Sequence, residues 1–106
     1  MRNSRLFKEL SESVSVVEYD DETDEDMTIV SSINAFIRLQ QTSEDILGTG
    51  QFVEAGKYVG IILKPDSRIK EGMIITSTSN NHPSRLNILS QQTVLHVQLL
   101  VMEIRV

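Results

Sequence analysis

Residues 58–76, YVGIILKPDSRIKEGMIIT, carry the clearest fold signal in the chain. An apolar run stops at a Pro-Asp pair, a polar corner follows, and a second apolar run begins after a glycine. Short apolar runs bounded by turn residues are typical of strands, and proline cannot donate to a sheet ladder. We therefore expect two strands, residues 58–64 and 73–79, that pair with each other at the centre of a small β domain. The residues predicted to shape the turn between them are Pro65, Asp66 and Gly72.

Four further segments show the alternation of apolar and polar residues that half-buried strands require. They are residues 13–19, 27–41, 85–90 and 94–106. In the last segment the apolar parity changes between two adjacent leucines, Leu99 and Leu100. This change predicts either a β-bulge at that point or a strand covered on both faces.

Six strands with short links predict an all-β fold with at most a minor helix: a small six-stranded antiparallel β-barrel or sandwich. The length of 106 residues fits one domain. We expect residues 11–106 to form it and residues 1–10 to be an N-terminal arm or short helix, because Leu6, Phe7 and Leu10 share one face at helical spacing. With 40% hydrophobic residues and no Trp, the core must be aliphatic.

Composition and charge exclude several classes of function. The net charge is −5 and the ten Lys and Arg residues are scattered, whereas binding through phosphate neutralisation needs a basic patch. The absence of Cys excludes disulfides and thiolate chemistry. No apolar run approaches the roughly 20 residues that span a bilayer, so we expect no membrane partner and synthesis in the cytoplasm.

The acidic run DDETDED, residues 20–26, is the most concentrated chemistry in the chain. A run this charged must be solvated, and it joins two adjacent strand segments, so we predict a long β-hairpin with an acidic tip. Three interpretations are open: a cation site, an electrostatic surface that repels phosphate or meets a basic partner, and a solubilising tip. An EF-hand is not indicated, because the run lacks a central Gly and its flanks are strands. The candidate interaction residues of this run are Asp20, Asp21, Glu22, Asp24, Glu25 and Asp26.

Residues 42–56, TSEDILGTGQFVEAG, form a second candidate interaction loop. Ser43 with the two acids after it could cap one helical turn that ends at Gly48. We expect a mobile excursion with a short helix at most, anchored by Phe52. The residues assigned to this loop are Thr42, Ser43, Glu44, Asp45, Gly48, Gly50 and Phe52.

No pattern in the chain predicts catalysis, a cofactor or a metal site. His82 lies in an Asn-rich loop and His96 in a strand segment, and no spacing supplies the further ligands that zinc needs. No Gly-rich phosphate loop and no nucleophile elbow is present. We therefore expect a binding or structural protein rather than an enzyme.

The order of these elements resembles one known family. SVSVVEYD runs into the polar tip DETDEDM, and the long strand TIVSSINAFIRLQQTSED follows, with Glu44 near its end. GKYVGIILKPDSRIKEGMIIT supplies a strand, a Pro-Asp turn, an Ile-x-x-Gly-Met pattern and a strand, and LHVQLLVMEIRV, with Glu103, closes the fold. Over residues 11–106 this layout resembles the small head-closure proteins of tailed bacteriophages, also called head-to-tail joining, head-completion or stopper proteins. The chain departs from the family at STSNNHPSRLNIL, where the family usually has an aromatic-rich strand.

The resemblance implies a structural virion component at the head-to-tail junction. Such a subunit would form a homo-oligomeric ring that closes the portal or adaptor channel, retains packaged DNA and presents a surface for tail attachment. The implied partners are the portal, adaptor and tail proteins, with DNA passing without sequence-specific binding. Two alternatives stay open: a tail-terminator-like ring protein at the same junction, and a stand-alone β-barrel module that binds nucleic acid.

Overall fold

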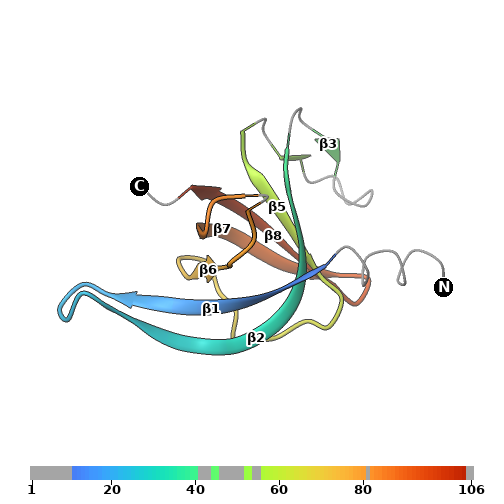
Figure 1. Ribbon diagram of the computed structural model, residues 1–106. Helices are drawn as coiled ribbons and strands as arrows, with labels where there is room; N and C mark the ends of the chain where they lie inside the picture. The colour runs from blue at the N-terminus through green and yellow to red at the C-terminus, as the bar shows by residue number, and fades with distance from the viewer. Residues whose placement is uncertain (1–10, 41–43, 46–51, 54–55, 81, 105–106) are drawn as a thin grey trace.

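A closed six-stranded β-barrel dominates the computed structural model, which describes residues 11–40, 44–45, 52–53, 56–80 and 82–104 (Figure 1). Around the barrel the strand order is β1-β2-β5-β8-β7-β6, and every neighbouring pair is antiparallel. A two-stranded sheet, β3-β4, stands apart from it. The strands are β1 (Glu12–Asp20), β2 (Glu25–Leu39), β3 (Glu44–Asp45), β4 (Phe52–Val53), β5 (Tyr58–Ile62), β6 (Ile74–Thr76), β7 (Arg85–Val94) and β8 (Val97–Ile104).

The predicted all-β fold class is therefore confirmed, and of the two predicted forms, barrel and sandwich, the protein adopts the barrel. No residue in the described parts of the chain is helical, and no helix there is long and apolar enough to cross a membrane. Each β-branched run predicted as a strand contributes to the barrel wall, as expected for Val- and Ile-rich segments.

The predicted pairing of β5 with β6 is wrong. β5 lies between β2 and β8, whereas β6 lies between β1 and β7, so the two strands occupy opposite positions in the cycle of six. Residues 63–73 connect them and are far longer than the two to five residues of a hairpin loop. Because apolar alternation is a local property, it identifies strands without identifying their partners.

The core fills the interior of the barrel with aliphatic side chains from every wall strand. Ile69, from the polar corner, points inward and is fully buried. Gly60 leaves room for the Met102 side chain in the core, because a Cβ atom at position 60 would lie 2.9 Å from the Met102 Cε atom. The core cluster is Val14, Val16, Val30, Ala35, Tyr58, Ile62, Ile69, Ile75, Leu86, Ile88, Leu100 and Met102.

The prediction for the C-terminal strands needs two corrections. The segment predicted as one strand from residue 94 is broken by a two-residue turn, Leu95-His96, with φ angles of 52° and 66°. Such turns usually carry Asn-Gly, so Leu-His gave no turn signal. The ladder irregularity lies in β7, between Ile88 and Ser90, and not at the adjacent leucines of β8. The alternative prediction, a strand covered on both faces, is confirmed, because Leu99 and Leu100 belong to separate buried clusters.

The β1–β2 hairpin extends beyond the closed part of the barrel (Figure 1). β1 pairs with β6 only over residues 15–17, and β2 pairs with β5 only over residues 36–39. The remainder of the hairpin is paired only within itself, out to the Asp20–Glu25 pair at its tip. The hairpin therefore carries the Asp20–Glu25 end of the acidic run beyond the strands that close the barrel.

Candidate functional site

The tip of the β1–β2 hairpin is a tightly bonded turn. The Asp24 amide donates to the Asp20 carbonyl oxygen at 2.8 Å, and the Glu22 amide donates to Asp20 Oδ1 at 2.9 Å. Asp24 adopts a φ of 57°, a left-handed conformation that Asp tolerates better than most residues. The Tyr19 hydroxyl donates to Asp24 Oδ1. The predicted acidic hairpin tip is thus present, with a defined backbone.

Charge at this tip is only partly neutralised. Residues 21–26 are exposed, and Asp20 is half-buried. Asp26 forms a bidentate ion pair with Arg85 of β7, with oxygen–nitrogen distances of 2.7 and 2.9 Å. The hydrogen bonds to Asp26 raise the pKa of Arg85 above its usual value. Bidentate carboxylate–guanidinium pairs fix geometry as well as charge, so Asp26 ties the hairpin to the barrel.

The other five acids of the tip form no ion pair with a described cation. Within the described parts of the chain, no three His, Asp or Glu side chains converge closely enough to hold a metal ion. This geometry does not distinguish an electrostatic surface from a solubilising tip, and both stay predictions.

The second candidate loop is described only in part. Glu44 and Asp45 form β3, which pairs with Phe52 and Val53 of β4. The helical turn predicted around Ser43 is thus wrong at these two acids, because the segment pairs with a strand partner that local capping signals do not reveal. The other residues assigned to this loop, Thr42, Ser43, Gly48 and Gly50, lie outside the described residues.

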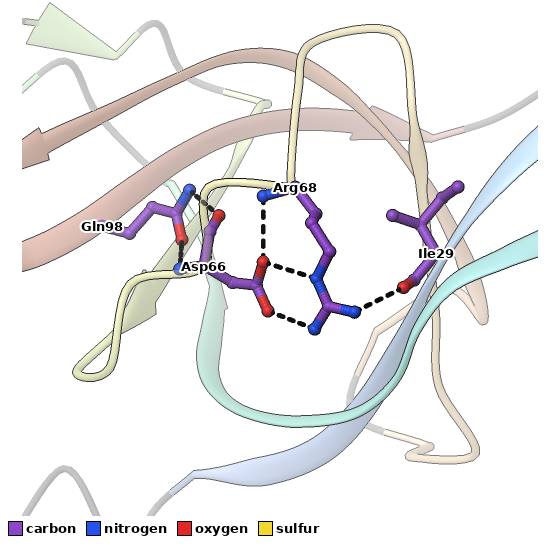
Figure 2. Close-up of polar contacts among 4 residues, drawn as sticks. All are labelled: Ile29, Asp66, Arg68 and Gln98. Carbon is purple, nitrogen blue, oxygen red and sulfur yellow. Dashed lines mark hydrogen bonds and ion pairs between the residues drawn. The ribbon is translucent and has the colours of Figure 1, made fainter.

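The Pro65-Asp66 corner joins three parts of the barrel, as Figure 2 shows. Asp66 Oδ1 accepts from the Arg68 amide at 2.9 Å and from Arg68 Nε at 3.0 Å, and Oδ2 accepts from Arg68 at 2.7 Å. Arg68 also donates to the Ile29 carbonyl oxygen of β2 at 3.3 Å. These Arg68 hydrogen bonds lower the pKa of Asp66. Gly72 has a φ of 89°, and its amide donates to the Ile88 carbonyl oxygen, so Asp66 and Gly72 both help to shape this connection.

Gln98 completes this corner from inside the barrel (Figure 2). Its side chain, in a residue only 1% exposed, accepts from the Asp66 amide at 2.9 Å and donates to the Asp66 carbonyl oxygen at 3.1 Å. The same amide group donates to Gln91 Oε1 at 3.0 Å. Sequence reasoning missed this role, because a polar residue within an apolar strand carries no local signal of its partner.

His82 forms a second buried polar link that the sequence did not indicate. Its side chain is 2% exposed, and its ring nitrogens lie 2.8 Å from the Pro83 carbonyl oxygen and 2.5 Å from Glu12 Oε1. Ser77 Oγ donates to the same Glu12 oxygen at 2.7 Å. Glu12 therefore fastens the start of β1 to the loop between β6 and β7. His96, in contrast, is exposed at the β7–β8 turn.

A hollow of about 320 Å³ opens on the outer wall over β2 and β5. Its lining combines apolar side chains of both strands with short polar ones and a single cation. The residues are Ser11, Ser32, Ile33, Asn34, Phe36, Ile61, Leu63 and Lys64. None of them belongs to the acidic tip, the second loop or the Pro65-Asp66 turn, so sequence reasoning did not anticipate this feature.

Comparison with known protein families, with curated proteins and with solved structures gave no match.

Proposed function

We propose that this protein is a structural subunit of the head-to-tail connector of a tailed bacteriophage, where it forms a ring that closes the portal or adaptor channel and receives the tail. The observation that carries the proposal is a small closed barrel with a long projecting hairpin, β1–β2, that ends in a cluster of exposed acids. A closed barrel leaves few free sheet edges for uncontrolled strand pairing, and its projection supplies a separate surface for neighbours.

Charge supports a conduit rather than a DNA clamp. The net charge is −5, and five tip acids lack an ion-pair partner among the described residues. Such a surface repels phosphate, so DNA can pass without being held. The same charge argues against the stand-alone nucleic-acid module, which needs a basic groove with exposed aromatic side chains.

Assembly is the direct test. Sedimentation velocity and negative-stain images of the purified chain over a wide range of concentration should reveal closed rings, either alone or on portal–adaptor complexes encoded beside it. A chain that stays monomeric at every concentration and does not bind those complexes would contradict the proposal. Binding to tail tubes but not to portal–adaptor complexes would instead favour the tail-terminator role.

The contribution of the acidic tip can be tested separately. The double variant Asp21→Lys with Glu25→Lys replaces two exposed acids of the tip with cations and leaves the Asp26–Arg85 pair intact. We expect it to bind double-stranded DNA weakly and in a salt-dependent manner, measured by fluorescence anisotropy. The matched control, Glu18→Lys with Glu71→Lys, makes the same two charge reversals at exposed acids outside the tip. Equal DNA binding by both variants would show that the position of the acids is unimportant.

A further inference from the structure

The outer wall of the barrel carries an apolar face that the proposed function does not use. On β5, Tyr58 and Ile62 point into the core, while Val59 and Ile61 belong to a second cluster. Alternation along a strand places this second pair on the outside. β8 aligns Leu99 with Ile61 and Val101 with Val59. We define the outer apolar face as the outward side chains Phe36, Val59, Ile61, Leu63, Leu99 and Val101.

Two residues at the centre of this face are almost completely buried. Val59 is 3% exposed and Leu99 is 2% exposed, although both point away from the core. The described residues packed against them, Ile61, Val94, Val97 and Val101, are wall residues that are themselves only partly buried. An outward side chain on a barrel wall faces water unless another segment lies over it. These neighbours lie beside the pair in the same sheet, so its burial indicates that another segment lies over it.

The start of the described chain leads directly to this face. Ser11 lines the hollow together with Phe36, Ile61 and Leu63, so residues 1–10 join the described structure at the border of the outer apolar face. Adjacent strands are about 4.8 Å apart, so β2 and β8 are separated by roughly 10 Å across β5. Ten residues reach about 15 Å as a helix or about 33 Å when extended, which is enough in either form.

We propose that the outer apolar face is the docking site for residues 1–10 of the same chain. This segment offers Leu6, Phe7 and Leu10 at helical spacing, the pattern of a stripe that packs on an apolar surface. The segment between Gln40 and Gly56, of which only Glu44, Asp45, Phe52 and Val53 are described, leaves and returns beside the Tyr58 end of β5. The hollow lies at the opposite end of β5, next to Leu63 and Lys64.

Thiol labelling tests this docking cleanly, because the chain contains no cysteine. The variant Ile61→Cys places one thiol on the face, and Glu18→Cys places a control thiol on the exposed side of β1. The labelling rate with a bulky maleimide is compared between the full chain, a chain lacking residues 2–10, and the full-length variant Leu6→Ser with Phe7→Ser. The last variant guards against misfolding of the shortened chain, and circular dichroism verifies the barrel in each.

We expect the thiol of Ile61→Cys to react at no more than about one-tenth of the rate in the full chain that it shows in both arm variants, because labelling follows the open population of the covered site. The Glu18→Cys thiol should react equally in all three, and protection should not depend on protein concentration. If the Ile61→Cys thiol reacts slowly in all three chains, a segment other than residues 1–10 covers the face. If it reacts fast in all three, nothing covers the face. Protection that appears only at high concentration would make a second copy the occupant. Each of these three outcomes overturns the proposal, and none depends on whether the chain forms rings.

Discussion

The barrel wall and the projecting hairpin divide the molecule into two regions with opposite physical characters. In the wall, β5 and β8 are covered on both faces, and their side chains belong to two apolar clusters. At the hairpin tip, residues 21–28 are all exposed, and backbone hydrogen bonds and one ion pair hold the shape. Stability therefore resides in the wall, while the tip can change its charge with little effect on the fold.

The largest expected effect comes from the centre of the wall. Leu100→Ala removes a fully buried side chain of the core cluster and leaves a cavity, so we expect the free energy of unfolding to fall by about 2–5 kcal/mol. Urea denaturation followed by circular dichroism measures it. The control Leu95→Ala changes a side chain that is 76% exposed at the β7–β8 turn and should shift stability by less than about 0.5 kcal/mol. Similar losses for both variants would break the distinction between wall and surface.

A smaller loss is expected from the polar link between wall and corner. Gln98→Met keeps side-chain bulk but leaves the Asp66 amide without its Gln98 partner, whereas the Asp66 carbonyl oxygen still accepts from the Ile69 amide. An unsatisfied buried polar group costs about 1–3 kcal/mol, and the same denaturation measurement would detect it. Gln91→Met is the matched control, because Gln91 is exposed and bonds only to the Gln98 side chain in this network. If Gln98→Met proves as stable as the parent protein, the corner does not depend on this link.

The Asp66–Arg68 pair should give a pH-dependent effect. Because Arg68 lowers the pKa of Asp66 in the folded protein, the carboxylate stabilises the fold above its unfolded pKa of about 3.9 and loses that contribution as the pH falls through the folded value. The stability difference between the parent protein and Asp66→Asn should therefore be largest near neutral pH and shrink below about pH 4. Denaturation curves across this range test it, with Asp21→Asn at the tip as control. A constant difference would show that the Asp66 charge is unimportant.

The smallest effect on stability is expected at the tip. Asp21→Asn, Glu22→Gln and Glu25→Gln together should change the free energy of unfolding by less than about 1 kcal/mol, since the charges are exposed and close to one another. Relief of repulsion makes a slight gain the expected direction, and added salt should reduce it. Thermal unfolding at low and high salt is the measurement. A large loss would mean that these acids hold the hairpin rather than act as a surface.

The sequence identified most strands because alternation is a local property of the chain. The Val- and Ile-rich runs and the exposed acidic tip were both predicted from residue order. The turn at Leu95-His96 was not, because neither residue prefers a positive φ. The partial strand β3 was also missed, since Glu44 and Asp45 resemble the start of a helix.

Tertiary structure alone decided which segments meet. It separated β5 from β6, brought Arg85 to Asp26, and buried His82 against Glu12. It also placed the hollow beside Ser11, at the edge of an apolar outer wall. These contacts join residues that are far apart along the chain, and they depend on the closure of the whole barrel, in which every strand fixes the position of its neighbours. Local patterns determine which residues form strands and which must face water, whereas only the closed barrel determines partners.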